Sequence, residues 1–148
     1  MKKQQGGFTL IELIMVIVIL GILAAFALPR FADFSGQARY SSINGALGAV
    51  RSASAIVHSA AIAANQTGAT GSITLEGQPI ALVHGYATQA SILTAAQLSN
   101  DFDTTTAGTI KLGACSFTYT AATSAASGVT ISAITGATGT PPSSCAPN

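Results

Sequence analysis

An apolar run near the N-terminus constrains this chain more than any other feature. From Phe8 to Leu28 there are 21 residues, and Glu12 is the only charged residue among them. A helix of that length is ~31 Å long, which is enough to cross the hydrocarbon core of a bilayer. Lys2 and Lys3 precede the run, so we expect them to stay on the cytoplasmic side while the body after the run faces outward.

A secretory signal peptide and a plain membrane anchor are two other interpretations of this run. A signal peptide also has a basic start and an apolar stretch, but that stretch is shorter than the one in this chain. The run is followed by the residues PRF at 29–31, where a signal peptide would have the small residues of a cleavage site. Hydropathy alone does not exclude a plain anchor.

Glu12 separates these interpretations, because a carboxylate in a lipid-facing helix costs about 2.5–3.5 kcal/mol on insertion scales. We therefore expect it to have a partner, and the leader offers none close by. Cleavage between Gly7 and Phe8 would create an α-amino group four residues before Glu12, on the same helix face and at the positive end of the helix dipole. Glu12 could pair with that amine or with the amine of a neighbouring copy, and the second pairing would set the axial register of a polymer.

The N-terminal sequence, Gly7 followed by FTLIE at 8–12, resembles the type IV prepilin signature. That family has a short basic leader ending in Gly, then Phe, a Glu at the fifth mature position and an apolar stretch. The short leader is similar to the IVa class. The resemblance implies cleavage after Gly7 by a membrane prepilin peptidase and N-methylation of Phe8. It also implies assembly through the apolar helix, with Phe8 and Glu12 as assembly residues, into a filament that leaves the inner membrane for the cell surface.

A helical pattern continues beyond the membrane segment. Apolar and small residues recur three or four positions apart and form one stripe: Ile43, Leu47, Val50, Ser54, Val57 and Ala61. The pattern predicts one helix from about residue 8 to about residue 63, ended by a loop at 65–72. Gly21 and Pro29 are the expected kink positions, because proline removes a backbone hydrogen bond and clashes with the preceding turn. The resemblance adds the alternative that the stretch between them loses helicity inside a filament.

After residue 72 the apolar residues alternate with polar ones, which predicts antiparallel strands. The alternating or short apolar runs lie at 72–75, 80–83, 109–112, 115–120 and 129–132. Gly77 and Pro79 indicate a turn, and a short helix is an option at 91–98. Because a helix stripe and a sheet face can bury each other, we predict an α+β fold, with the long helix packed on a small antiparallel sheet. The predicted parts are the leader 1–7, the membrane and assembly part 8–28, the amphipathic part 29–63 and the globular head 64–148.

Cys115 and Cys145 are the two cysteines of the chain. In a small exported body, two cysteines favour a disulfide over two free buried thiols. The bridge would close a loop of about 30 residues and contribute roughly 3–4 kcal/mol on the chain-entropy model. It would also tether a tail at 136–147 that is rich in Gly, Thr, Pro and Ser. The closed loop resembles the D-region of pilins, which is usually exposed on the filament.

Only 7% of the residues are charged and they form no cluster, which argues against a nucleic-acid partner. His58 and His84 are far apart in sequence and have no carboxylate nearby, so we expect no metal or catalytic site there. Asp101 and Asp103 could bind calcium, but a solvated turn is the better interpretation. The chain contains no Gly-x-Ser-x-Gly or phosphate-loop pattern, and we expect neither an enzyme nor a bound cofactor.

Together with these features, the resemblance to prepilins implies a structural subunit of a type IV pilus, used for adhesion or motility. The resemblance implies other pilin subunits, the inner membrane, the prepilin peptidase and the assembly machinery as partners. A pseudopilin of a type II secretion system and a monomeric membrane-anchored binding module are the alternatives, and the cysteine pair favours the pilin. A finer resemblance to pilins of the mannose-sensitive haemagglutinin (MSHA) group lies at 29–31, 60–61 and 85–86, and implies a surface pilus used in attachment.

Overall fold

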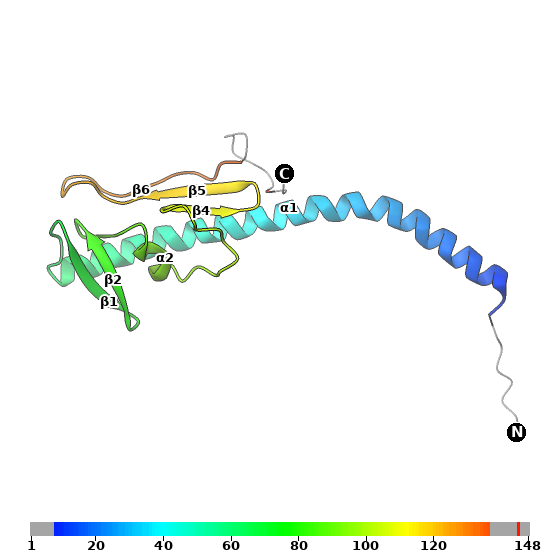
Figure 1. Cartoon of the computed structure of the whole chain (residues 1–148), viewed down its shortest axis with the longest axis horizontal. Helices are drawn as coiled ribbons and strands as arrows, with labels where there is room; N and C mark the ends of the chain where they lie inside the picture. Colours follow the sequence, from blue (N-terminus) through cyan, green and yellow to red (C-terminus); the bar gives the residue numbers. More distant parts are fainter. Residues whose placement is uncertain (1–7, 137–144, 146–148) are drawn as a thin grey trace, which may run out of the picture.

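The computed structural model describes residues 8–136 and Cys145, so the leader with Gly7 and most of the C-terminal tail lie outside the described residues. One 54-residue helix, α1 (Leu10–Ala63), dominates the structure, and α2 (Ser91–Ala95) is a single short turn of helix. The strands are β1 (Gly71–Leu75), β2 (Gln78–Val83), β3 (Tyr86–Ala87), β4 (Thr109–Leu112), β5 (Cys115–Thr120) and β6 (Thr130–Ile131). Figure 1 shows the strands and α2 gathered along the C-terminal half of α1, while the N-terminal half projects alone.

The single long helix confirms the sequence prediction at both ends within two residues. It ends at Ala63, and Asn65 then takes a left-handed conformation with φ 55° that turns the chain back toward β1. The helix continues without a break through Gly21 and Pro29, and Figure 1 shows its axis curving in the N-terminal half. The role of these two residues as kink positions stays a prediction.

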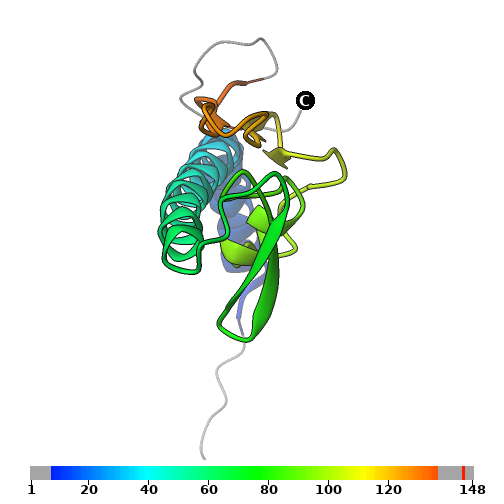
Figure 2. The ribbon, with the colours of Figure 1, turned by 90° about the vertical axis from the view of Figure 1, so that its left-hand side faces the viewer.

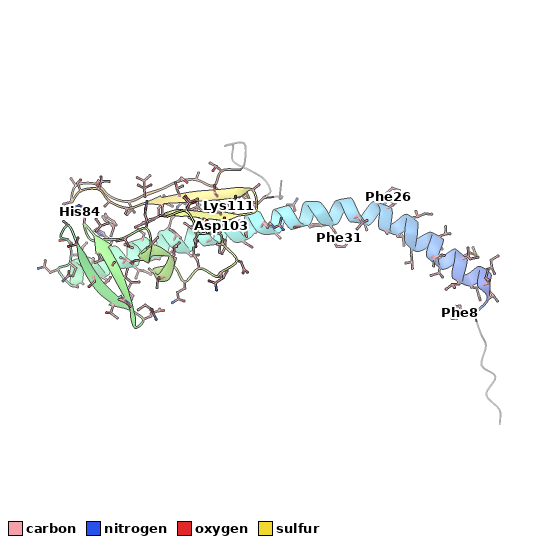
Figure 3. All side chains as sticks on the ribbon, viewed as in Figure 1. Phe8, Phe26, Phe31, His84, Asp103 and Lys111 are labelled. Atoms are coloured by element: carbon pink, nitrogen blue, oxygen red, sulfur yellow. A yellow bond between two sulfur atoms is a disulfide. The ribbon has the colours of Figure 1, made fainter. Side chains whose placement is uncertain are left out.

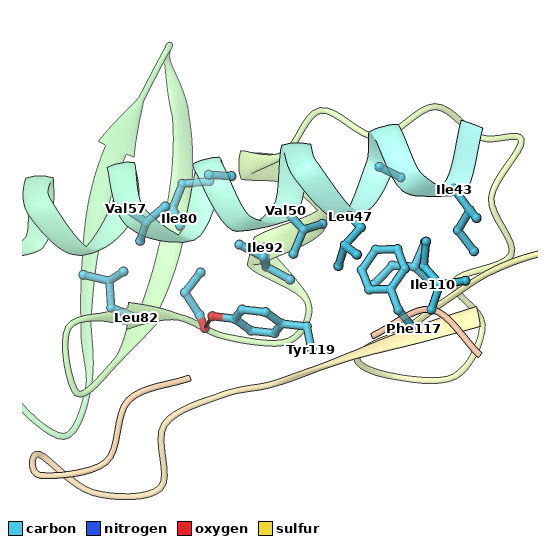
Figure 4. Close-up of a cluster of buried hydrophobic side chains, with 14 of the residues drawn as sticks. Ile43, Leu47, Val50, Val57, Ile80, Leu82, Ile92, Ile110, Phe117 and Tyr119 are labelled. Atoms are coloured by element: carbon cyan, nitrogen blue, oxygen red, sulfur yellow. Dashed lines mark hydrogen bonds between the residues drawn. The ribbon is translucent and has the colours of Figure 1, made fainter. Parts of the chain in front are cut away.

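The predicted apolar stripe of α1 forms one side of the hydrophobic core. All six of its residues are buried: Ile43, Leu47, Val50, Ser54, Val57 and Ala61. Residues from both sheets and from α2 pack on this stripe, as Figure 4 shows: Ile80, Leu82, Ile92, Ile110, Phe117 and Tyr119. Figure 2 views the molecule along α1 and shows the sheets and α2 on one side of the helix. The packing of a helix stripe on antiparallel strands confirms the α+β prediction.

The strands form two small antiparallel sheets, ordered β1-β2-β3 and β4-β5-β6, where the alternation had suggested one. Strand β3 was not predicted, because two residues are too few to show a period. Two-residue turns join the strands of the first sheet. Glu76 and Gly77 have φ of 50° and 78°, and His84 and Gly85 have φ of 50° and 79°. Positive φ at both positions is the geometry of a type I′ hairpin turn.

The predicted turn position of Pro79 is wrong, because Pro79 lies inside β2, opposite Thr74 of β1. The register explains why a proline is tolerated there. Leu75 and Gln78 flank the two-residue turn as a hydrogen-bonded pair, so the next pair does not exchange backbone hydrogen bonds. On its other side β2 pairs with β3 only at Leu82 and Val83. The N–H group that Pro79 lacks would therefore have had no strand partner.

Tyr119 links the two sheets through the core. Its side chain is fully buried, and its hydroxyl donates a hydrogen bond of 2.8 Å to the backbone carbonyl of Ala87 in β3. Burial raises the pKa of Tyr119 to about 12, and a hydrogen bond with the Ser54 side chain partly opposes this rise. The neutral phenol is therefore the form that the fold favours.

We expect the head to lose stability in alkali through Tyr119. The phenol of Tyr119 has a pKa near 10 in the unfolded chain and about 12 in the fold. The neutral phenol therefore contributes its full share to the free energy of unfolding below about pH 10, and this share is lost as the pH rises to about 12. The expected loss over this window is about 2–3 kcal/mol. Urea unfolding of the full chain in detergent, followed by near-ultraviolet circular dichroism, measures it.

The Tyr119→Phe variant provides the control for this alkaline loss. At neutral pH it should be about 1–2 kcal/mol less stable, since the carbonyl of Ala87 loses its donor. Its stability should then fall less than that of the wild type between pH 10 and pH 12. An identical alkaline loss in the Tyr119→Phe variant would contradict the role given to this phenol.

Candidate assembly site

The N-terminal part of α1 presents a bare apolar cylinder. The segment Leu10–Leu28 has 19 residues, is apolar enough to cross a membrane and is not buried by any other part of the chain. At about 1.5 Å per residue it is ~28 Å long, close to the thickness of a bilayer core. Its large apolar side chains have exposed fractions between 46% at Ile14 and 76% at Leu10. The segment Phe34–Ala63 passes the same test of length and composition, but it is partly buried as the core helix of the head.

Figure 3 shows this cylinder with its side chains, with Phe8 at the end farthest from the head and Phe26 and Phe31 along it. An apolar surface of this size is unstable in water and marks contact with a membrane or with other protein. Phe31 and Phe34 extend the exposed surface toward the head, since their exposed fractions are 69% and 63%. The geometry therefore provides a long apolar surface over Leu10–Leu28 that lipid or further copies can cover.

Glu12 lies at the very start of α1 and takes part in its N-terminal cap. Its carboxylate Oε2 accepts hydrogen bonds from the Thr9 backbone N at 2.8 Å and from the Thr9 hydroxyl at 2.7 Å. The Glu12 backbone N in turn donates to the Thr9 Oγ1 at 3.3 Å. These reciprocal bonds form a capping box, which satisfies two backbone donors that the helix itself cannot satisfy.

The capping box gives Glu12 a partner in the uncut chain, Thr9, which lies outside the leader and was not predicted. Thr-x-x-Glu before an apolar run is a recognisable capping signature, so the sequence carries a signal for this contact. The cap also fixes the position of the carboxylate. Its Oε2 lies 2.8 Å from the amide nitrogen that directly follows Phe8. An α-amino group at Phe8 would therefore form one residue away from this negative charge.

Cys115 and Cys145 form a disulfide, with their Cα atoms 5.2 Å apart, as predicted. Both residues are fully buried. The backbone N of Cys145 donates a 2.9 Å hydrogen bond to the carbonyl of Gly36 in α1. At Gly113, an added Cβ would lie 2.8 Å from the Cys145 carbonyl oxygen, so this turn has no room for a larger side chain. The C-terminal cysteine is thus fixed against α1 near the point where the helix enters the head.

The structure brings His58 to the β2–β3 turn that contains His84. His58 is partly buried and its Nδ1 lies 2.9 Å from the carbonyl oxygen of Gly85. Because a carbonyl only accepts, Nδ1 carries the hydrogen of this bond. The imidazole also stacks on Tyr86, with ring centroids 3.9 Å apart. His84 lies in the β2–β3 turn. His58 therefore connects α1 to Gly85 and Tyr86, the two residues that follow His84.

The two aspartates of the 99–106 loop receive hydrogen bonds from their own neighbours. The Ser99 hydroxyl donates to Asp101 at 3.1 Å, and Asp103 accepts from the backbone N and the hydroxyl of Thr105 at 3.1 and 2.7 Å. The bonds from Thr105 lower the pKa of the Asp103 carboxyl, and the charge of Lys111 adds to this effect. Within residues 8–136 and Cys145, no group of three or more His, Cys, Asp or Glu side chains is placed to hold a metal ion.

The N-terminal segment of the chain matches a known family model. Residues 2–28 match the prokaryotic N-terminal methylation motif. No solved structure gives a significant match to the chain.

Several proteins of known role are similar to part of the chain. It is 58% identical over 53 residues to the type IV narrow pilus major component PilA5 of Thermus thermophilus, covering 36% of this chain and 46% of that protein. It is 49% identical over 51 residues to the type IV major alpha-pilin of Moraxella bovis, covering 34% of this chain and 32% of that protein. It is 43% identical over 53 residues to a type IV major fimbrial protein FimA of Dichelobacter nodosus, covering 36% and 34%. The chain thus matches from a third to under half of the length of these relatives, which are structural subunits of pili.

Proposed function

We propose that this chain is the structural subunit of a type IV pilus. The observation that carries the proposal is an exposed apolar helix, Leu10–Leu28, that begins with a single carboxylate at a fixed distance from Phe8. Lipid can cover the apolar surface before assembly, and the same segments of other copies can cover it in a filament. The similarity to major pilins and the match to the methylation motif support this role.

The proposal divides the chain by task. The leader 1–7 keeps the precursor in the inner membrane until a prepilin peptidase cuts between Gly7 and Phe8, and Phe8 is then N-methylated. Residues 8–28 are the membrane and assembly part, 29–63 carry the amphipathic stripe, and 64–148 form the head. Once the chain is cut, the Glu12 carboxylate pairs with the amine at Phe8 of its own or a neighbouring copy. These assignments rest on the motif match and on the proximity of Glu12 to Phe8.

The proposal extends to the use of the filament at the cell surface, in adhesion or motility. The finer assignment to the MSHA group rests on the short sequences at 29–31, 60–61 and 85–86. Of these, Ala61 lies in the core and Gly85 and Tyr86 contact His58. Loss of attachment in a strain lacking this chain, with attachment restored by re-expression, is the expected result.

The Gly7→Ala variant tests the proposed maturation. We expect it to stay uncut in the inner membrane, because the peptidase acts directly after this glycine. The wild-type chain should begin at Phe8 and carry one extra methyl group, as measured by mass spectrometry of sheared filaments. Gly6→Ala is the matched control and should be processed like the wild type.

Other outcomes of this experiment would identify the alternative functions. A mature chain that starts at Met1 or after Leu28 would contradict the pilin and favour a membrane-anchored binding module. Normal cleavage without any surface filament made mainly of this chain would instead favour a pseudopilin of a secretion system.

A further inference from the structure

The head has a pocket on one flank of α1, where α1, the β1–β2 hairpin and α2 meet. Its volume is about 400 Å³, within the range of small binding pockets. Ala53 and Ile56 of α1 and Ile80 of β2 form an apolar floor. Ile56 lies at the edge of the pocket and has an exposed fraction of 57%, whereas Ala53, one helical turn before it, is buried.

Polar groups line the rim of this pocket, and nearly all of them can accept hydrogen bonds. They include the carboxylate of Glu76, the amide oxygens of Gln78 and Gln97, and the hydroxyl of Thr94. Glu76 is the one charged residue in the lining. The Gln97 Nε2 donates to Glu76 Oε2, which holds the carboxylate at the rim and leaves its other oxygen available. An apolar floor beneath a carboxylate fits a cation on an apolar stem.

The backbone places Glu76 in the left-handed region, which has a local cost for a residue with a long side chain. Glu76 is the first residue of a type I′ turn and has φ 50°. Asn, Asp and Gly are the residues that suit this position, because a longer side chain is strained at positive φ. Gln97, its hydrogen-bond partner, also has a positive φ of 48°. Strained residues that converge on one pocket point to a function for their side chains.

The complementary cation lies on the opposite flank of the same helix. Arg51 is exposed, and no described carboxylate pairs with it. At about 100° per residue, Arg51 points roughly 140–160° away from Ile56 and Ala53, which line the pocket. The Arg51 side chain therefore cannot enter the pocket of its own molecule.

The other described charges of the head leave Glu76 and Arg51 on opposite flanks of α1 without partners of opposite charge. The pocket adjoins a second hollow through Thr94, and Asp103 lines that hollow. Lys111, the other exposed cation among the described residues of the head, already lies beside Asp103, whose pKa it helps to lower. Figure 3 shows Asp103 and Lys111 together on the head. Among the described exposed cations of the head, Arg51 is thus the one without a carboxylate beside it.

We infer that Arg51 of one copy inserts into the Glu76 pocket of the next copy, with its stem on the apolar floor and its guanidinium on the carboxylate. This inference rests on the proposed pilus function and names a head-to-head contact within it. A contact between two different flanks is heterologous. A pair of copies therefore still has one free Glu76 pocket and one free Arg51 flank, and the chain of contacts can continue along a helical filament.

Charge exchange between the two residues tests the contact in cells that express the full chain. Glu76→Arg and Arg51→Glu should each reduce the yield of sheared filaments about tenfold or more, because each places like charges together at the contact. The combined Glu76→Arg and Arg51→Glu variant should recover the yield to within about threefold of wild type. Combining Glu76→Arg with Lys111→Glu should give no recovery. Asp101→Arg, an equal change of charge outside the pocket, should have a much smaller effect.

The Glu76→Asn variant separates the contact from the stability of the hairpin. Asparagine suits the turn, so the head should unfold at the same or higher urea concentration than wild type. The filament yield should nevertheless fall, because the carboxylate is gone. An unchanged yield would overturn the inference.

Cross-linking tests the geometry directly. A chain that carries both Arg51→Cys and Gln78→Cys should give a ladder of disulfide-linked multimers on a non-reducing gel, whereas each single variant should give monomers. Dimers from a single variant would indicate a two-fold contact and contradict the inference. If wild-type filaments form but the charge exchanges are inert and no ladder appears, the inference fails while the proposed function stands. If the wild type forms no filament, the proposed function fails, and the inference with it.

Discussion

Replacing Glu12 with Gln should abolish filaments while leaving the precursor helix intact. Glutamine at this position can still accept the hydrogen bonds of the capping box with Thr9, so the start of α1 keeps its cap. Glutamine carries no charge and cannot form an ion pair with the α-amine of Phe8. We expect the yield of sheared filaments to fall at least about a hundredfold, since an ion pair shielded from water contributes several kcal/mol. Electron microscopy and immunoblotting of the sheared fraction measure this loss.

Two further variants separate the charge of Glu12 from its capping role. Glu12→Ala loses both, and we expect it to assemble as poorly as Glu12→Gln. Thr9→Ala loses the capping hydroxyl but keeps the carboxylate, so it should cost about 1 kcal/mol of helix stability and leave most filaments in place. If Glu12→Gln assembled normally and Thr9→Ala did not, Glu12 would serve as a helix cap alone.

Removing the disulfide should produce the largest loss of stability in the head. The bridge spans 30 residues, which corresponds to about 3–4 kcal/mol on the chain-entropy model. A variant with both Cys115→Ala and Cys145→Ala should lose this amount in urea unfolding of the full chain in detergent. It should also lose part of the contact between Cys145 and Gly36, because the free tail has little apolar surface to hold it in place.

Reduction of the wild-type protein provides an independent measure of the same contribution. Dithiothreitol should lower the unfolding midpoint of the wild type to near that of the double alanine variant, and should leave the variant unchanged. Alanine is the suitable replacement, because both positions are fully buried and serine would place an additional hydroxyl in the core. A loss below about 1 kcal/mol in both experiments would show that other contacts hold the C-terminal segment.

Local periodicity explains why so much of the fold could be predicted. The stripe from Ile43 to Ala61 repeats at helical spacing, and each of its six residues is in the core. The alternation at 109–112 and 115–120 matches β4 and β5 to the residue. These patterns arise because one face of each element must be apolar to be buried, which leaves the same period in the sequence.

The start of the candidate assembly site could also be predicted largely from the sequence. The position of Glu12 in an apolar run is a local anomaly, and it needs no tertiary contact to be noticed. Its hydrogen bonds with Thr9 are local as well, so the capping signature could have been recognised beforehand.

Contacts between distant segments could not be predicted in the same way. The division into two sheets, the pairing of β3, and the hydrogen bond from the Tyr119 hydroxyl to Ala87 depend on how loops fold back, and such loops carry no period. The same holds for Cys145 on Gly36, since composition suggested the disulfide but not the place where the tail meets the helix.

The apolar N-terminal run by itself predicted a helix of membrane-spanning length, because its 21 residues contain a single charge. Only the tertiary structure decided which surfaces of the head are available for contact with further copies. It placed Glu76, whose turn gives no sign of a binding role in the sequence, beside residues from α1 and α2 to form a pocket, and it left Arg51 on the other flank. A binding surface of this kind joins side chains that are far apart in the chain, so it exists only after the elements have packed.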